Sequence, residues 1–184
     1  GLNELFKSTD RGDTWRSLGD LTTRSDRRTL EIMGQRPDSF TLSLDDGIPY
    51  WPALTVIAES EFTPGVLYVG TDDGQVQVSR DDGRTWANVT ATVPGLPGMA
   101  WVNGIHASKH RDGRLWLVAN NYRNDDYANH LWRSDDHGAS WTSVAGDLPA
   151  DRVARTVRED PRNPEVLYLG TELGVFWSWN GGAN

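Results

Sequence analysis

The chain has 184 residues, a formal net charge of −8 at pH 7 and no cysteine. An acidic surface repels phosphate, so neither a nucleic acid nor an anionic membrane is expected as a partner. The lack of cysteine excludes a disulfide framework and thiol chemistry, and no apolar run is long enough to predict a membrane span. The sequence starts at Gly1 and stops inside a repeated motif, so we expect a section of a longer protein.

Short runs rich in Val, Leu, Tyr, Trp and Thr alternate with Gly, Pro and Asp, which predicts short β-strands joined by tight turns. The first two strands are expected at residues 4–8 and 14–18. A long, mostly polar connection follows at 19–52, with one helical turn expected at 28–33. Eleven further strands are predicted at residues 53–60, 66–70, 75–79, 85–90, 101–108, 114–119, 129–134, 140–144, 153–159, 166–170 and 174–178.

A turn motif, Ser-x-Asp-x-Gly-x-Thr/Ser-Trp, occurs at residues 8–15, 79–86 and 134–141 and begins again at residue 178. We call these segments the Asp turns. The Asp side chain is expected to accept backbone N–H groups across the turn, and Gly to adopt φ > 0. The Trp should pack between neighbouring sheets. The residues predicted to be structural are Asp10, Gly12, Trp15, Asp81, Gly83, Trp86, Asp136, Gly138 and Trp141.

A second repeat sets the period of the chain. Residues 64–74 and 164–174 share seven of eleven positions at an offset of one hundred residues, which is two repeats of about fifty. Fifty residues with four short strands is the size of one β-propeller blade. The sequence therefore predicts an all-β propeller segment of about three to four four-stranded blades, part of a larger propeller. Its expected parts are half a first blade (1–18), a long loop (19–52), a second blade (53–90), a third blade (91–144) and an incomplete fourth blade (145–184).

The Asp turns resemble the Asp-box, or bacterial neuraminidase repeat, of sialidases, xyloglucan-cleaving glycoside hydrolases and sortilin-type receptors. The stretches "LYVGTDDGQVQVSRDDGRTW" and "NYRNDDYANHLWRSDDHGASW" are most similar to large secreted bacterial propellers related to sortilin. The resemblance implies a propeller that is secreted or held in the cell envelope of a bacterium. It is specific for the fold and unspecific for the activity.

Candidate ligand contacts lie on the rim opposite the Asp turns, because each Asp turn joins the third and fourth strands of a blade. Carboxylates beside aromatic rings suit a carbohydrate. For Asp73 and its neighbour Asp72, however, a hairpin turn bonded to its own backbone is the favoured alternative. For the loop at 120–127 both alternatives stay open, and Arg123 is expected to pair with Asp125 or Asp126. The candidate contacts are Asp73, Arg123, Asp125, Asp126 and Glu172, with Trp51 or Trp101 beside them.

Neither glycosidase chemistry is complete in the sequence. The Arg-Ile-Pro segment of sialidases is absent. A xyloglucanase-type enzyme needs two opposed aspartates across a cleft, and half of such a cleft would lie outside this chain. His106 and His110 do not share a face, so no metal and no cofactor are expected. The favoured hypothesis is a non-catalytic scaffold that binds a peptide, protein or glycan and joins the remaining blades of its parent. The alternative is part of a glycoside hydrolase, sialidase-like or xyloglucanase-like, whose rim carboxylates act as acid and base.

Overall fold

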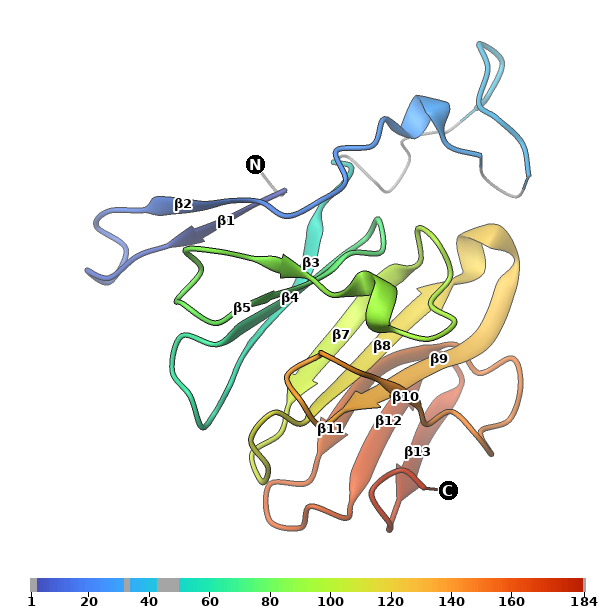
Figure 1. The fold of residues 1–184 in the computed structure, drawn as a ribbon. Coiled ribbons are helices and arrows are strands. Elements are labelled where there is room, and N and C mark those ends of the chain that lie inside the picture. The colour runs from blue at the N-terminus through green and yellow to red at the C-terminus, as the bar shows by residue number, and fades with distance from the viewer. Residues whose placement is uncertain (1–2, 32–33, 43–49, 184) are drawn as a thin grey trace.

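Four small antiparallel sheets stand side by side in chain order, and each is a meander of consecutive strands (Figure 1). The computed structural model describes residues 3–31, 34–42 and 50–183. The first sheet has two strands, the second and third have four each, and the last has three. This is the predicted all-β propeller segment: half a blade, two whole blades and an incomplete one.

The first sheet is formed by β1 (Glu4–Lys7) and β2 (Arg16–Asp20), and η1 (Arg27–Thr29) follows it. The second sheet comprises β3 (Leu54–Glu59), β4 (Leu67–Thr71), β5 (Val76–Ser79) and β6 (Ala87–Asn88), followed by η2 (Thr90–Thr92). The third comprises β7 (Trp101–Ala107), β8 (Leu115–Asn121), β9 (Asp126–Ser134) and β10 (Thr142–Ser143), with η3 (Tyr122–Asn124) between β8 and β9. The last comprises β11 (Ala154–Glu159), β12 (Leu167–Thr171) and β13 (Gly174–Ser178).

Several predicted elements have other bounds in the structure: the second strand, expected at 14–18, is β2 at 16–20, and the strand expected at 129–134 begins earlier, as β9. The turn expected at 28–33 is the short 3-10 helix η1, and residues 32–33 lie outside the described part. The fourth strands β6 and β10 have only two residues each. In the second sheet the ladder ends because the chain turns into η2 and the Val76 N–H is taken by the Thr90 hydroxyl (2.8 Å). Among the described residues, no helix is long and apolar enough to cross a membrane.

The first strand of each blade is the innermost, so β3, β7 and β11 lie next to one another. The Thr55 hydroxyl on β3 donates to the Val102 carbonyl on β7 (2.6 Å). Close packing explains a glycine shared by the two matching repeats, against the next blade at Gly70 and against β11 of its own sheet at Gly170. A Cβ at Gly70 would lie 2.4 Å from a Val102 methyl, and one at Gly170 would lie 2.9 Å from a methyl of Thr156.

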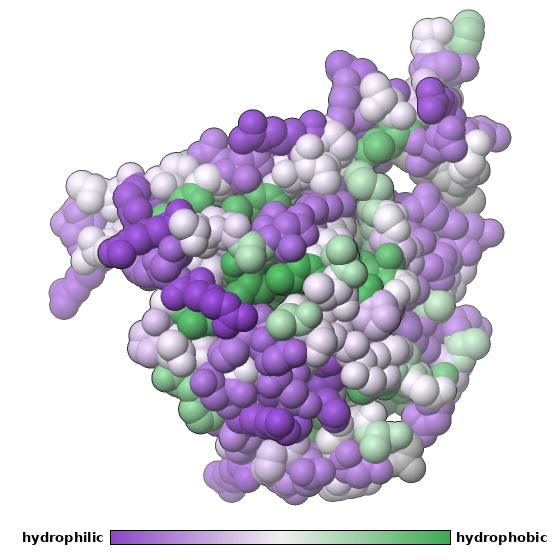
Figure 2. Space-filling view, in the orientation of Figure 1, coloured by the Kyte–Doolittle hydropathy of each residue, from purple (hydrophilic) through white to green (hydrophobic). Residues whose placement is uncertain are grey.

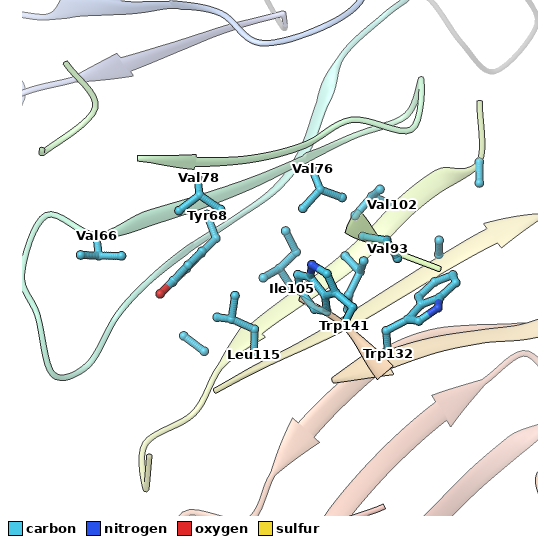
Figure 3. Close-up of a cluster of buried hydrophobic side chains, with 14 residues drawn as sticks. Val66, Tyr68, Val76, Val78, Val93, Val102, Ile105, Leu115, Trp132 and Trp141 are labelled. Atoms are coloured by element: carbon cyan, nitrogen blue, oxygen red, sulfur yellow. The ribbon is translucent and has the colours of Figure 1, made fainter. Parts of the chain in front are cut away.

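Two apolar cores fill the spaces between successive sheets. In the first, Tyr68, Val76 and Val78 of the second sheet face Ile105 and Trp141 of the third (Figure 3). The second core lies between the third and last sheets. Hydrophilic residues cover most of the face seen in Figure 2, and hydrophobic residues gather where the second and third sheets meet.

The three Asp turns have the same hydrogen bonds, as predicted. Asp10, Asp81 and Asp136 each accept a backbone N–H from the residue four positions later, at 2.9, 2.8 and 2.9 Å. The glycine N–H of each turn donates to the first serine, and the three glycines have φ of 98°, 76° and 83°. In the fourth turn Asn180 takes the place of Asp and accepts from the Ser178 hydroxyl (2.8 Å).

The tryptophans of the Asp turns follow the predicted order of burial. Trp141 is 7% exposed and Trp15 is 63% exposed. Trp86 is half-buried rather than largely buried, and its indole N–H donates to the Leu18 carbonyl of the first sheet (3.2 Å). Trp86 faces only the two-stranded first sheet, which is too small to cover the ring completely.

Candidate functional site

The two rims of the segment carry different loops. The Asp turns bond to the loops that join the first and second strands of their own sheets: the Asp82 N–H donates to the Gly65 carbonyl (2.9 Å) and the His137 N–H to the Gly113 carbonyl (2.9 Å). These two sets of loops therefore share one rim. The opposite rim carries the β4–β5, β8–β9 and β12–β13 connections and the segments that lead into the inner strands. All the predicted ligand contacts belong to this second rim, which we call the loop rim.

The β8–β9 connection is an extended hairpin and not the long loop expected at 120–127. β8 continues to Asn121 and β9 begins at Asp126, and these two residues pair across the ladder. Only η3 and Asp125, in the left-handed region with φ of 59°, join the strands. The hairpin projects Arg123 from the third blade toward the segment that precedes the second blade.

The expected ion pair of Arg123 with Asp125 or Asp126 is wrong. The guanidinium carbon of Arg123 lies 4.6 Å from the ring centre of Trp101 and 5.8 Å from that of Trp51. Asp126 instead accepts from the ring of His130 (2.8 Å). A cation over an aromatic face is attracted by the quadrupole of the ring. Arg123 therefore lies over the two indoles and does not pair with Asp125 or Asp126.

Asp126 has a structural place in the hairpin. Partial burial acts to raise the pKa of Asp126, but hydrogen bonds from the Ala128 N–H, the Asn121 amide and His130 outweigh it and lower the pKa. Asp125 is exposed at the tip of the hairpin. Within the described part of the chain, neither Asp125 nor Asp126 forms a hydrogen bond with Trp51 or Trp101.

A small cavity lies against Arg123 and Trp51. Its volume is about 190 Å³. A second arginine, Arg27 at the start of η1, places its guanidinium carbon 5.8 Å from the ring centre of Trp51. The cavity is lined by Arg27, Leu30, Glu31, Trp51, Gly98, Met99, Arg123 and Asn124.

The prediction of Asp73 as a ligand contact is wrong, because its side chain is fully buried. One carboxylate oxygen accepts from the N–H (2.7 Å) and hydroxyl (2.6 Å) of Thr23, and the other accepts from the Thr71 hydroxyl. Asp73 therefore anchors the long connection to the second blade. The structural alternative is thus favoured over a ligand contact, but the carboxylate bonds to Thr23 and to the Thr71 hydroxyl and not, as was expected, to the backbone of its own turn.

Asp72, the neighbour of Asp73, is 4% exposed and accepts the Ala53 N–H (2.7 Å) through Oδ1. Its other oxygen receives no hydrogen bond from a described residue. Burial raises the pKa of Asp72 to about 6; the Ala53 N–H acts in the opposite direction, and the Coulombic effect of Arg123 lowers it as well. Asp72 is thus electrostatically coupled to the arginine of the cavity.

Glu172 lies at the junction of the third and last blades. It forms a salt bridge with Arg155, whose guanidinium carbon lies 5.1 Å from the ring centre of Tyr122. The structure thus brings Arg123, Trp51 and Trp101 together and leaves Glu172, Asp125 and Asp126 in separate contacts. No group of three or more His, Asp or Glu side chains that could hold a metal ion occurs among the described residues.

Sequence reasoning missed Arg27, Leu30 and Glu31, which lie in the connection between the first two blades. The one available signal was the length of that connection, since structureless loops longer than about 12–15 residues are uncommon and are often functional. For Asp72 the sequence favoured a turn residue over a ligand contact, because burial and its effect on the pKa are not visible in the local sequence.

No family model matches the chain. It is 30% identical over 135 residues to a xyloglucanase of Hypocrea jecorina, covering 65% of this chain and 16% of the relative. A xyloglucanase of Acetivibrio thermocellus is 24% identical, with 69% and 17% covered. An oligoxyloglucan-reducing end-specific xyloglucanase of Emericella nidulans is 24% identical, with 90% and 22% covered. The chain thus spans about a fifth of the length of these relatives.

Solved structures show the same fold. An ancestral GH74 enzyme superposes with a TM-score of 0.65 at 20% identity, over 100% of this chain and 21% of that one. The GH74 xyloglucanase of Xanthomonas campestris gives 0.64 at 18% identity, over 98% and 26%. YCF48 of Cyanidioschyzon merolae gives 0.52 at 21% identity, over 74% and 40%. Together with the four radial sheets, these likenesses establish that the chain is a segment of a β-propeller.

Proposed function

We propose that the chain is one section of a propeller glycoside hydrolase of the xyloglucanase type, and that its loop rim forms part of the saccharide-binding groove. The sequence relatives are named xyloglucanases, which favours the hydrolase alternative over a non-catalytic scaffold. The cluster of Arg123, Trp51 and Trp101 beside a cavity supports the position of the groove. The remaining blades, and the rest of the groove, would come from the parent protein.

Two finer assignments belong to the same proposal. The shared hydrogen bonds of the Asp turns support their assignment as Asp-box repeats, the class that also occurs in sialidases and sortilin-like proteins. A polysaccharide substrate is too large to enter a cell intact. The parent would therefore act outside the cytoplasm, in the medium or the envelope of a bacterium.

The observation that carries the catalytic part of the proposal is the state of Asp72. Among the described carboxyl groups, Asp72 alone has a raised pKa, at about 6, and the other resolved carboxyl shifts are downward. Glycoside hydrolysis needs one carboxyl that is protonated near neutral pH and can donate to the leaving oxygen. Asp72 has this property and lies on the loop rim, where its Oδ2 carries no hydrogen bond from a described residue.

A second carboxylate has to lie across the groove, about 5–10 Å from the first. Two other predicted rim acids do not qualify as partners on their own contacts, since both carboxylate oxygens of Asp73 already accept hydrogen bonds from threonines and Asp126 is bonded within its hairpin. We propose that the second carboxylate comes from another part of the parent protein.

The test uses the parent protein that contains this chain in full, with xyloglucan as substrate and released reducing ends as the measurement. Asp72→Asn should lower kcat by about 100- to 10,000-fold, the usual contribution of a general acid. Asp125→Asn is the matched control, because it removes an exposed carboxylate of the same rim. Its kcat should equal that of the wild type.

The pH dependence gives an independent measurement. Asp72 must be protonated to donate, so kcat should fall as pH rises above about 6, the pKa of Asp72. This descending limb should be absent from the residual activity of Asp72→Asn. Full activity in Asp72→Asn would remove Asp72 from catalysis. If the wild type binds saccharide without releasing reducing ends, the non-catalytic binding surface is correct.

A further inference from the structure

Trp51 lies where the segment before the second blade meets the third blade, and its indole N–H does not hold it in place. That N–H is buried and has no hydrogen-bond partner among the described residues. The ring contacts cations instead: the guanidinium carbons of Arg123 and Arg27 each lie 5.8 Å from its centre. Arg123 also lies over Trp101 of β7, at 4.6 Å. Arg123 therefore ties the segment before β3 to the third blade.

The segment that Arg123 ties in this way leads directly to Asp72. Ala53 follows Trp51 by two residues, and Pro52 between them has little rotational freedom because its ring fixes φ. The Ala53 N–H donates to Oδ1 of Asp72 (2.7 Å), and the Ala53 carbonyl accepts from the Asp72 N–H (3.0 Å). The direction of the Asp72 carboxyl, and of its Oδ2, thus depends on where Trp51 lies.

The charge of Arg123 acts on the same carboxyl. Burial raises the pKa of Asp72 to about 6, the neighbouring Asp73 acts in the same direction, and Arg123 lowers it. The acid in the lining of the cavity, Glu31, is paired with Arg36 (3.2 Å). A general acid transfers its proton best when its pKa lies near the working pH. The cation thus limits how tightly the buried carboxyl holds its proton.

We propose that Arg123 is the positioning residue of Asp72: from the third blade it fixes the segment around Trp51 and supplies a positive charge to the surroundings of the carboxyl. The inference rests on the proposed general-acid role of Asp72 and adds to it a dependence on how the second and third blades meet. In this role Arg123 does not touch the reacting bond. Its loss should therefore slow proton transfer and leave saccharide binding unchanged.

The experiment measures kcat and KM for xyloglucan against pH in the full parent protein, with released reducing ends as the signal. Arg123→Met keeps an apolar side chain over the indoles and removes the charge. Its kcat should fall by about 10- to 100-fold, the usual cost of a displaced catalytic group, while KM stays as in the wild type. The pH at which kcat declines should move above about 6, because the cation that favours the ionised carboxyl is gone.

Arg123→Lys is the conservative variant. It keeps the charge, so kcat should decline at nearly the same pH as in the wild type, but lysine lacks the planar guanidinium that stacks on the indoles. Its kcat should therefore recover only in part. Arg155→Met is the matched control, because Arg155 lies on the same rim and over Tyr122 (5.1 Å) but is paired with Glu172. It should leave the pH profile unchanged. Thermal melting of each variant checks that the fold is intact.

A second measurement does not depend on hydrolysis. The infrared spectrum of the parent is recorded against pH, and subtraction of the Asp72→Asn spectrum isolates the carbonyl band of protonated Asp72. The midpoint of that band gives the pKa of Asp72, which should be higher in Arg123→Met than in the wild type. An equal midpoint would overturn the inference. A raised KM with unchanged kcat would overturn it as well, since Arg123 would then bind the saccharide and not position the acid.

Failure of this inference is separate from failure of the proposed function. If xyloglucan is hydrolysed and Arg123→Met changes neither kcat nor the infrared midpoint, the proposed function stands and the positioning role is wrong. If the midpoint moves but Asp72→Asn hydrolyses xyloglucan at the full rate, Arg123 acts on Asp72 as inferred and the assignment of Asp72 as the general acid is wrong.

Discussion

The first and third Asp turns have nearly the same sequence pattern and the same hydrogen bonds, yet their tryptophans lie in opposite environments. Trp15 is 63% exposed and Trp141 is 7% exposed, although each indole N–H donates to the glycine carbonyl of its own turn. The third turn packs against the preceding sheet: a Cβ at Gly138 would lie 3.4 Å from a methyl of Val78 and 3.6 Å from one of Val89. The first turn has no preceding sheet in this chain. The turn is therefore a local structure, whereas the burial of its tryptophan depends on the neighbouring blade.

The difference between the first and third Asp turns predicts its largest effect on the free energy of unfolding when the tryptophans themselves are replaced. Trp141→Ala should reduce the free energy of unfolding by about 3–5 kcal/mol, because it empties a core between two sheets. Trp15→Ala should cost under about 1 kcal/mol, because the ring is exposed. Urea denaturation followed by circular dichroism measures both. Similar losses for the two variants would contradict the dependence on a neighbouring blade.

A smaller effect is expected at the glycines of the turns. Gly12 and Gly83 both have positive φ, so Ala strains the backbone at either position. A Cβ at Gly83 would also lie 2.5 Å from a methyl of Leu18 in the preceding sheet, whereas at Gly12 the nearest atom is 3.8 Å away. Gly83→Ala should therefore cost about 1–3 kcal/mol more than Gly12→Ala. Equal costs in thermal unfolding would show that backbone strain alone decides.

The Asp turns were predictable because every hydrogen bond that defines them lies within eight residues. The repeat period also gave the sheets, since each blade is a meander of neighbouring strands. The outer strands were predicted too long. In the second blade the ladder ends where the Val76 N–H bonds to the Thr90 side chain, which depends on the exact position of η2.

The candidate site was predicted less completely, because its members come together from distant parts of the chain. Arg123 was correctly placed on the loop rim, but its contacts with Trp51 and Trp101 depend on how two blades meet. The pattern Arg-Asn-Asp-Asp suggested local ion pairs instead. Asp73 was identified as a rim residue, yet its bond to Thr23 crosses the long connection, and the local sequence gives no sign of it.

The contact between Thr23 and Asp73 tests how the first sheet is held to the second blade. Thr23→Val removes the hydroxyl donor and keeps the backbone N–H, so the buried carboxylate loses one of its partners. We expect a loss of about 1–2 kcal/mol in the free energy of unfolding. Thr29→Val, at an exposed hydroxyl of η1 that bonds only within its own turn, is the control and should cost less. An equal cost would mean that the connection is not anchored at Asp73.

The smallest effect concerns the carboxylates of the turns, and it tests the local half of the comparison. Hydrogen bonds from the Thr14 hydroxyl and N–H lower the pKa of Asp10 from 3.8 to about 2, and the pKa of Asp136 is lowered by the equivalent bonds from Ser140 against the opposing effect of burial. A lowered folded-state pKa gives stability that is present above pH 3.8 and is lost as pH falls through about 2. Both turns should therefore begin to lose this contribution below about pH 4.

Carbon-detected NMR titration of the two carboxyls measures each pKa directly. If the pKa of Asp136 is lowered and that of Asp10 keeps its ordinary value, the turn itself requires a neighbouring blade, and the separation of local turn from blade-dependent tryptophan is wrong.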